Sequence, residues 1–273
     1  MKILLLGSNS MAGHIIMQYL LGQNTYEVHG IPEENFSIIS FFNKIKKLKP
    51  NVVINTLRIL VEASTEDPKK ALFINSYLPK VMEKMLINSK IKIIHLSSDC
   101  VFSGNEGNYS EPNVPDGDSV YSISKFCGEI VNEKDLTIRA SYVGPTNREV
   151  EEELFDWVLR QSGIIQGYEN ALWNGITTLE LAKQIHKAII SNICGLYHLC
   201  SNEKISKYEL LLLIKKYWRL KSIKIEKFSS KKIDRSLLDN RKILSVKSYD
   251  EMFSELYQYM IINKSSYEHY NRQ

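Results

Sequence analysis

The chain has 273 residues, of which 44% are hydrophobic and 24% charged, as in ordinary globular proteins. A formal net charge of +4 is too small to indicate nucleic-acid binding by itself. No apolar run approaches the roughly 20 residues that a membrane-spanning helix needs. The apolar start of the chain is too short for the core of a signal peptide. We therefore expect a cytoplasmic protein that binds neither nucleic acid nor membranes.

The four cysteines give no sign of a disulfide framework or a metal site. Cys100, Cys127, Cys194 and Cys200 form no C-x-x-C pair. His198 lies between the last two cysteines, but this stretch alternates apolar and polar residues as a strand does. We expect reduced thiols, as in a cytosolic protein, and no bound metal.

The first half of the chain alternates short apolar runs with helical stretches. Strands are predicted at residues 2–6, 26–31, 51–55, 91–96 and 136–140, and helices at 11–21, 38–47, 68–86 and 119–134. Most of these strands are apolar throughout, which indicates a parallel sheet covered on both faces. The sequence therefore predicts an α/β fold with a doubly wound, Rossmann-type sheet.

After about residue 145 the pattern becomes less regular. Helices are predicted at 154–161, 177–190 and 207–219, and a strand at 195–199. The tail after Asn263 is polar, and we expect it to be frayed. Residues 1–145 would form a dinucleotide-binding domain that carries the catalytic residues. Residues 146–273 would form a smaller mixed α/β substrate lobe that does not fold independently.

A glycine turn follows the first predicted strand and precedes the first helix. A glycine at this place lets the backbone approach a pyrophosphate, and the helix N-terminus offers free N–H groups. The spacing is G-x-x-G-x-x-G, except that serine holds the middle position. A plain strand-to-helix turn is the alternative. The turn consists of Gly7, Ser8, Asn9, Ser10, Met11, Ala12 and Gly13.

A tyrosine and a lysine four residues apart provide the second signal. Tyr121 and Lys125 would lie on one face of the helix predicted at 119–134. The spacing alone is weak, because Tyr217 and Lys221 share it in a region without other signs of chemistry. Ser98, however, follows the strand at 91–96, and ligands of parallel sheets bind at the carboxyl ends of strands. A hydroxyl, a Tyr/Lys pair and a glycine turn together predict an active site.

These motifs resemble the dTDP-4-dehydrorhamnose reductase family of extended short-chain dehydrogenases. The resemblance is most specific from Ser97 to Glu129 and covers most of the chain. It rests on Ser98-Asp99-Cys100-Val101-Phe102-Ser103-Gly104, Tyr109-Ser110-Glu111, Tyr121-Ser122-Ile123-Ser124-Lys125 and Gly128-Glu129. Weaker likeness extends to Met11–His14, Pro50–Asn55, Asn75, Arg139–Pro145 and Gly175–Ala182.

The resemblance implies a reductase that uses NADP or NAD in the reduced form. Hydride would pass to the C4 ketone of a nucleotide-linked 4-keto-6-deoxy sugar, for the synthesis of surface polysaccharide. Tyr121 would protonate the developing alkoxide, and Ser98 would hydrogen-bond the carbonyl oxygen. Lys125 would hold the nicotinamide ribose and lower the pKa of Tyr121.

The resemblance also implies which residues contact each ligand. Besides the glycine turn, the cofactor would contact Asn55, Thr56, Leu57, Asn75, Ser97, Tyr121, Lys125, Gly144 and Pro145. The nucleotide-diphosphate sugar would contact Asp99, Val101, Phe102, Tyr109, Trp173, Gly175 and Arg235. Arg235 would pair with a phosphate, or it is a solvated arginine. The oligomeric state stays open, with a homodimer among the options.

The chain departs from the family pattern mainly around the cofactor. Ser10 replaces a glycine, and the second strand ends in Glu33 and Glu34 without the usual ribose-binding aspartate. These glutamates would favour NAD or belong to a solvated loop. Ser37 lies where the family often has an aspartate nearby, and Arg58 stands where small residues are common.

Two alternatives to the reductase therefore remain open. One is a non-catalytic regulatory subunit that kept the reductase fold, like the regulatory subunit of methionine adenosyltransferase. The other is an epimerase or dehydratase that uses the same three residues with bound NAD. Dehydratases of this fold usually place acidic residues directly after the serine or threonine, and here Asp99 is not followed by a glutamate.

Overall fold

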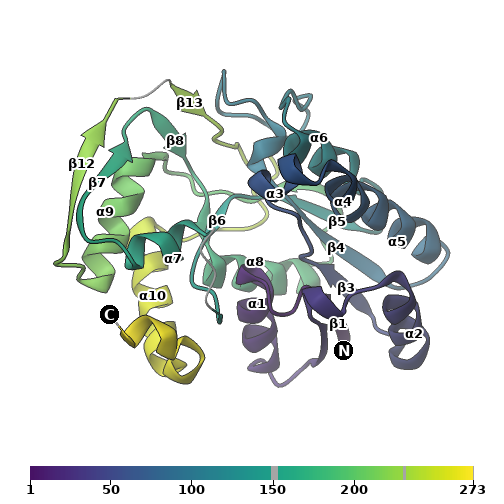
Figure 1. The fold of residues 1–273 in the computed structure, drawn as a ribbon. Coiled ribbons are helices and arrows are strands. Elements are labelled where there is room, and N and C mark those ends of the chain that lie inside the picture. The colour runs from purple at the N-terminus through teal and green to yellow at the C-terminus, as the bar shows by residue number, and fades with distance from the viewer. Residues whose placement is uncertain (149–152, 230–231, 273) are drawn as a thin grey trace.

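A six-stranded parallel sheet forms the larger part of the molecule, and a smaller part lies beside it (Figure 1). The computed structural model describes residues 1–148, 153–229 and 232–272. The strand order is β10-β5-β4-β3-β1-β2, and this doubly wound sheet confirms the predicted fold class. The strands are β1 (Lys2–Leu6), β2 (Glu27–Ile31), β3 (Val52–Asn55), β4 (Lys92–Ser97), β5 (Leu136–Arg139) and β10 (Gly195–His198).

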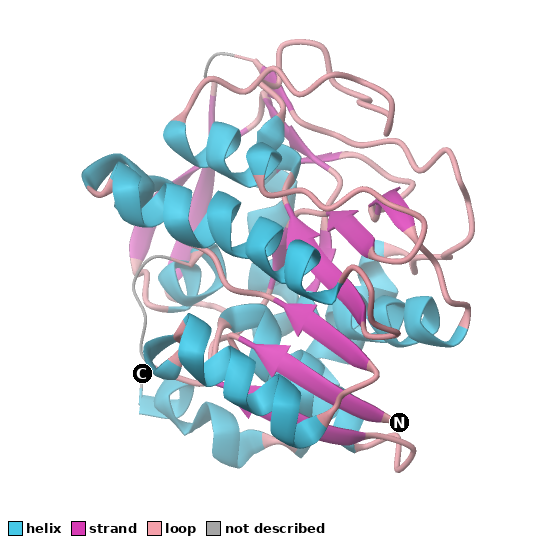
Figure 2. Cartoon of the chain, turned by 90° about the vertical axis from the view of Figure 1, so that its right-hand side faces the viewer, coloured by secondary structure: helices cyan, strands magenta, loops and turns pink. Residues whose placement is uncertain are grey.

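Helices cover both faces of this sheet, which is why its strands are apolar throughout (Figure 2). Ile3 and Leu5 of β1 belong to one apolar core, whereas Leu4 and Leu6 belong to the core on the opposite face. The helices of the first face are α1 (Met11–Leu21) and α8 (Thr178–Ile190), and those of the second are α2 (Ile38–Leu48) and α5 (Leu78–Leu86). The chain leaves β1 for β2 on one side and returns to β3 on the other. The ligand-binding crevice of such a sheet lies between β1 and β3, at the carboxyl ends of the strands.

Two predicted helices differ from the observed ones. The helix expected at 119–134 is only α6 (Val120–Cys127), because Gly128 caps it and the chain then turns. The helix expected at 68–86 contains a π-helical stretch, η2 (Leu72–Tyr77), between α4 (Pro68–Ala71) and α5. A short helix, α3 (Val61–Glu66), precedes it and was not predicted.

The smaller part combines helices with short strands. The helices are α7 (Leu154–Leu159), α9 (Lys207–Trp218) and α10 (Tyr249–Ile262), of which α10 was not predicted. The strands are β6 (Tyr142–Val143), β7 (Gly163–Tyr168), β8 (Ala171–Trp173), β9 (Ile176–Thr177), β11 (Ile205–Ser206), β12 (Ile223–Phe228) and β13 (Ile233–Asp234). However, β10 comes after residue 145 and still joins the larger sheet, and α8, also after residue 145, packs on one face of that sheet. The division of the chain at residue 145 stays an interpretation.

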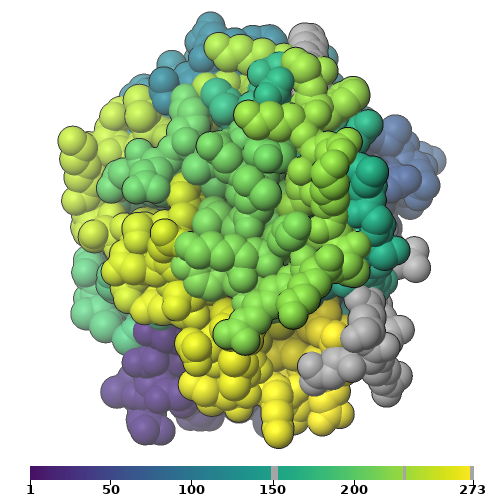
Figure 3. Space-filling model, turned by 90° about the vertical axis from the view of Figure 1, so that its left-hand side faces the viewer, coloured from purple at the N-terminus to yellow at the C-terminus, as the bar shows by residue number. Residues whose placement is uncertain are grey.

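The described part of the C-terminal tail, residues 264–272, packs against α1, so the expectation that the tail is frayed was wrong for these residues. Residues Lys264–Arg272 form a 3₁₀ segment, η4. Tyr267 is only 3% exposed, and its ring meets that of His14 on α1 edge to face. Figure 3 shows the yellow C-terminal residues beside the purple N-terminal ones. Within the described ranges, no helix combines the length and the apolar character needed to cross a membrane.

A buried ion pair joins the end of α6 to β5. The guanidinium of Arg139 donates two hydrogen bonds of 2.8 Å to Glu129, and Ser97 donates a third to Glu129 at 2.7 Å. The two charged side chains are 2% and 3% exposed. Arg139 also donates to His198 at 3.2 Å. Burial and the Arg139 charge lower the pKa of His198 to about 3, so its imidazole is neutral and can accept this bond.

We expect Glu129→Ala to lower the free energy of unfolding by about 3–5 kcal/mol, because Arg139 would keep a buried charge without its partner. Glu133→Ala removes the same group from an exposed position nearby and should change stability by less than about 0.5 kcal/mol. Urea denaturation of both variants, followed by circular dichroism, measures the difference. Equal stability of the two variants would contradict this role of the ion pair.

Candidate active site

The turn after β1 brings the first residues of α1 against the end of the strand. Gly7 has a φ of +75°, and a Cβ at Gly13 would lie 1.9 Å from the carbonyl oxygen of Gly7. Side chains are therefore excluded at both positions. The first N–H groups of this 11-residue helix have no intrahelical partners. The geometry suits an anion bound at the helix N-terminus.

Ser10, the departure from the glycine pattern, has a structural role in this turn. Its φ of −69° needs no glycine, and its hydroxyl caps α1 by accepting a hydrogen bond of 3.0 Å from the Gly13 N–H. The hydroxyl also lies 3.1 Å from that of Thr56. Thr56 in turn donates to the carbonyl oxygen of Gly7 at 3.0 Å. The end of β3 thus holds the turn in place, and serine is accommodated at the middle position.

Three residues that were expected to contact the cofactor, Asn55, Leu57 and Asn75, already make hydrogen bonds within the protein. Asn55 donates to His95 at 3.1 Å and accepts the N–H of Leu57 at 3.2 Å. Asn75 is fully buried and accepts the N–H of Ile59 at 2.9 Å. These bonds shape the wall of the crevice after β3. Direct contact of these residues with a dinucleotide stays a prediction.

The structure brings Ser98, Tyr121 and Lys125 together at the carboxyl end of β4. They line a cavity of about 140 Å³ and are 8%, 5% and 2% exposed. The Ser98 hydroxyl donates to Asp99 at 3.1 Å and accepts the N–H of Cys100 at the same distance. The ammonium of Lys125 donates to the carbonyl oxygen of Leu96 at 2.6 Å. Strand end and helix face therefore meet as the sequence predicted.

Burial dominates the electrostatics of this cavity. Burial raises the pKa of Tyr121, whereas the charge of Arg58 and a hydrogen bond with Ser98 oppose that rise. Burial, helped by the charge of Arg58, lowers the pKa of Lys125 to about 7. Arg58 is thus a cation that opposes the rise in the pKa of Tyr121, whereas the effect expected of Lys125 on Tyr121 stays a prediction. Tyr121 stays protonated at neutral pH, which is the form that can donate a proton.

Arg58 divides the crevice. Its guanidinium forms an ion pair with Glu153, donates to the hydroxyl of Tyr142 at 3.3 Å and lies 5.2 Å from the centre of that ring. It lines both the 140 Å³ cavity and a second cavity of about 180 Å³ that reaches Ser10 and Met11. Each is smaller than the roughly 300 Å³ at which ligand pockets begin. Leu60 is the other residue that lines both cavities.

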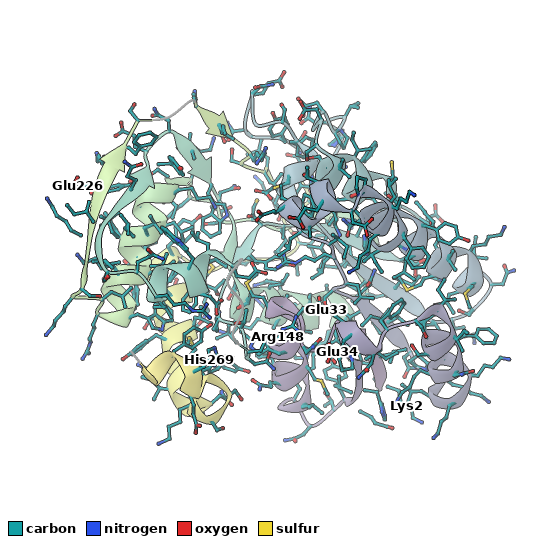
Figure 4. All side chains as sticks on the ribbon, viewed as in Figure 1. Lys2, Glu33, Glu34, Arg148, Glu226 and His269 are labelled. Atoms are coloured by element: carbon teal, nitrogen blue, oxygen red, sulfur yellow. The ribbon has the colours of Figure 1, made fainter. Side chains whose placement is uncertain are left out.

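Of the glutamates after β2, Glu34 is exposed, as expected of a solvated loop, whereas Glu33 is half-buried. Asn9 accepts the N–H of Glu33 at 2.9 Å and donates to Glu34 at 2.7 Å. Arg148 forms a 2.8 Å ion pair with Glu33, and Figure 4 shows both beside α1. Burial raises the pKa of Glu33, which the Arg148 charge opposes. No arginine was expected near the end of β2, but the fold brings Arg148 there from the loop after β6.

Most residues expected to line the sugar pocket are packed internally. Phe102 and Tyr109 stack with ring centres 4.1 Å apart and form a small apolar cluster with Val101. Trp173 is 3% exposed and donates to Ser141 at 2.8 Å. Their contact with a substrate stays a prediction.

The remaining expected contacts lie in two places. Gly144 and Pro145 follow β6 and are buried, and Gly175 precedes β9. Arg235 donates through Nε to the carbonyl oxygen of Phe102 at 3.0 Å, so it is held by the protein rather than solvated. Whether these residues bind substrate or cofactor stays a prediction.

Several residues around the site could not be predicted from the sequence. Glu153 and Arg148 pair with partners 95 and 115 residues away, and no local spacing signals such contacts. Lys207 lies 5.0 Å from the ring of Trp173 at the start of α9. Burial lowers its pKa, and the charge of Asp99 opposes this. Its nearness to Asp99 also depends on the fold alone.

A doubly wound sheet with a Tyr-x-x-x-Lys helix beside the end of β4 defines the class of extended short-chain dehydrogenases. The chain belongs to the family described as the RmlD substrate binding domain, whose sequence model matches residues 1–251. A search of curated proteins found no match.

Solved structures share this fold over nearly the whole chain. A dTDP-4-dehydrorhamnose reductase from Clostridium acetobutylicum is 20% identical with a TM-score of 0.83, covering 96% of this chain and 100% of its own. The Bacillus anthracis reductase, in complex with NADP, is 18% identical with a TM-score of 0.82, covering 94% and 99%. A UDP-glucuronic acid 4-epimerase from Bacillus cereus, with UDP-glucuronic acid and NAD, is 18% identical with a TM-score of 0.75, covering 96% and 100%. At these identities the likeness establishes the fold.

We expect Lys125 to titrate near pH 7, because burial and the neighbouring Arg58 charge both oppose its protonation. Arg58→Leu removes that charge, so the pKa of Lys125 should rise toward its usual value of about 10.4. NMR of ¹³Cε-labelled lysine measures both values, with the resonance assigned by its loss in Lys125→Met. A Lys125 resonance that titrates near its usual value in the unmodified protein would contradict this environment.

Proposed function

We propose that the protein reduces the keto group of a nucleotide-activated 4-keto-6-deoxy sugar, with NADH or NADPH as the hydride donor. The observation that supports this most is the convergence of Ser98, Tyr121 and Lys125 on one buried cavity. The cavity lies at the edge of the sheet where doubly wound folds bind ligands. Structures named as dTDP-4-dehydrorhamnose reductases share the fold over nearly their whole length.

The side chains have the protonation states that such a reduction needs. A bound reduced nicotinamide would supply the hydride to the carbonyl carbon. Tyr121, which burial keeps protonated, would donate its proton to the carbonyl oxygen as that oxygen gains negative charge. The Ser98 hydroxyl would hydrogen-bond the same oxygen. Lys125, with a pKa of about 7, exchanges protons readily at neutral pH and would return a proton to Tyr121.

A dinucleotide fits one end of the crevice better than the other. At the phosphate end, Gly7 and Gly13 leave room for the backbone approach, and α1 offers its N-terminus. At the other end, the Arg58 side chain stands between the two cavities. Binding across the crevice therefore requires Arg58 to leave Glu153 and Tyr142.

The position of Arg58 favours a second candidate, a regulatory subunit that kept this fold without catalysis. A divided crevice suits a protein that binds no dinucleotide. Against it, a scaffold has no physical need for a buried lysine beside a tyrosine and a serine. An epimerase or dehydratase with bound NAD would use the same three residues, and the panel of substrates below separates it from the reductase.

Oxidation of NADH or NADPH, followed by its absorbance, tests the proposal directly with a panel of nucleotide 4-keto-6-deoxy sugars. We expect turnover with one of them, and Tyr121→Phe should lower kcat by about 10²–10⁴-fold because the proton donor is lost. Dinucleotide affinity should survive this change. Tyr217→Phe, in the other Tyr-x-x-x-Lys pair, is the matched control and should keep full activity.

Two results would count against the reductase. Full activity of Tyr121→Phe would exclude the proposed proton donor. A protein that neither turns over any sugar of the panel nor binds either dinucleotide would be the regulatory subunit instead.

We expect a preference for NADH, because Glu33 lies at the end of β2, where the adenosine ribose binds in this fold. Its carboxylate would repel a 2′-phosphate. It also forms an ion pair with Arg148, which is then not available to bind that phosphate. Glu33→Gln should free Arg148 and raise the ratio of kcat/KM for NADPH to that for NADH by about tenfold or more. Glu27→Gln, at the exposed start of β2, is the control. An unchanged ratio in Glu33→Gln would show that Glu33 does not select the cofactor.

A further inference from the structure

A groove on the smaller part of the molecule is larger than either cavity of the candidate active site. Its volume is about 930 Å³, within the range of small-molecule sites. It lies where α7, α9 and α10 end and η4 begins. Its lining is basic and aromatic, and the aromatic side chains include Trp218, Tyr257, Tyr267 and Tyr270.

The charge of the groove is one-sided. Its described lining contains four cationic side chains, Arg160, Arg219, Lys221 and Lys264, and no carboxylate. Within the described residues, none of the four makes a hydrogen bond or an ion pair through its side chain. Asp156 interacts electrostatically with Arg160, but it is buried and already accepts hydrogen bonds from the protein. The groove therefore presents positive charge that no described residue pairs.

Helix ends explain only part of this charge. The C-terminus of a helix carries roughly half a negative elementary charge, which cations nearby offset. The ends of α7, α9 and α10 together supply about −1.5 charges, against the four cations. A surplus of roughly 2.5 positive charges remains for a ligand.

We propose that this groove binds a phosphate-bearing small molecule with an aromatic base, of the nucleoside diphosphate or triphosphate class. Arginine and lysine at the rim would bind the phosphates. Trp218 and Tyr257 are partly exposed and offer aromatic surface for the base. The size, the unpaired cations and the aromatic lining agree on this class of ligand.

The floor of the groove connects it to the dinucleotide crevice. The hydroxyl of Tyr267 lies 3.1 Å from Nε2 of His14. Nδ1 of the same histidine lies 3.0 Å from the carbonyl oxygen of Ser10 in the glycine turn. The hydroxyl of Tyr270 accepts the N–H of Thr146 at 2.9 Å, on the opposite wall of the crevice. A ligand that shifts these two rings would therefore shift both walls. This coupling rests on the proposed function, whereas binding in the groove does not.

Isothermal titration with ADP tests the binding site. The groove variant Arg219→Glu/Lys264→Glu and the control Lys44→Glu/Lys47→Glu change equal charge at exposed positions, so both should fold. We expect the groove variant to lose one ADP site, or to weaken it by at least about tenfold, since two phosphate-binding cations become anions. The control should bind as the unmodified protein does. ADP binding that the groove variant leaves unchanged belongs to the crevice and would overturn the proposal.

Fluorescence titration with NADH, with and without saturating ADP, tests the coupling. Competition between ADP and NADH inside the crevice would lower NADH affinity equally in the unmodified protein and in the groove variant. A difference between the two proteins in the effect of ADP on NADH affinity therefore comes from ADP bound in the groove. We expect a difference of about fivefold or more, which should disappear in Tyr270→Phe, where the ring stays and its hydroxyl is lost. Equal effects in all three proteins would overturn the coupling. Absence of NADH binding would refute the proposed function and the coupling, and leave the ADP result to decide the site.

Discussion

The candidate active site depends on the buried ion pair between Glu129 and Arg139. It fixes the segment just after α6 to β5, and the Ser97 hydroxyl ties the same carboxylate to β4. Lys125 adds a second attachment through the carbonyl oxygen of Leu96. A buried pair of charges contributes little net stability, but any arrangement that separates the partners is costly. The pair therefore restricts how the helix that carries Tyr121 can lie against the strand that carries Ser98.

A second constraint is the positive charge of Arg58 inside the crevice. It opposes the protonation of Lys125 and the rise in the pKa of Tyr121 at the same time. An oxidised nicotinamide is cationic and a reduced one is neutral, so a nearby guanidinium in a buried site disfavours the oxidised form. This charge would favour binding of the reduced cofactor but would oppose hydride transfer to a ketone, because that transfer leaves the cofactor cationic, so the proposed reduction requires Arg58 to move away from the nicotinamide. Glu153 and Tyr142 hold the guanidinium when no ligand displaces it.

Local pattern predicted the sheet because its strands bury both faces, and β1, β3 and β4 consist almost wholly of buried residues. The glycine turn and the Tyr121/Lys125 pair were also readable, since each depends on a spacing within one element. The end of α6 and the π-helical stretch η2 were missed, because contacts between them decide their geometry. Arg148 and Lys207 were missed for a related reason: they reach their partners only through the fold. The departures at Ser10 and Glu33 were visible in the sequence, but their partners, Thr56 and Arg148, were not.

Three of the departures from the family pattern, at Ser10, Glu33 and Arg58, differ in what they do to a cofactor. Ser10 is absorbed as a helix cap, and Glu33 is paired with Arg148, so neither closes the crevice. Arg58, by contrast, lies between the two cavities, and a side chain can rotate where a backbone cannot. The amine of Lys125 lies in a site that lowers its pKa from 10.5 to about 7. Burying this lysine in its charged form therefore costs free energy of folding. Strongly shifted groups of this kind concentrate at functional sites. A buried lysine held beside Tyr121 and Ser98 is therefore easier to explain by chemistry than by packing.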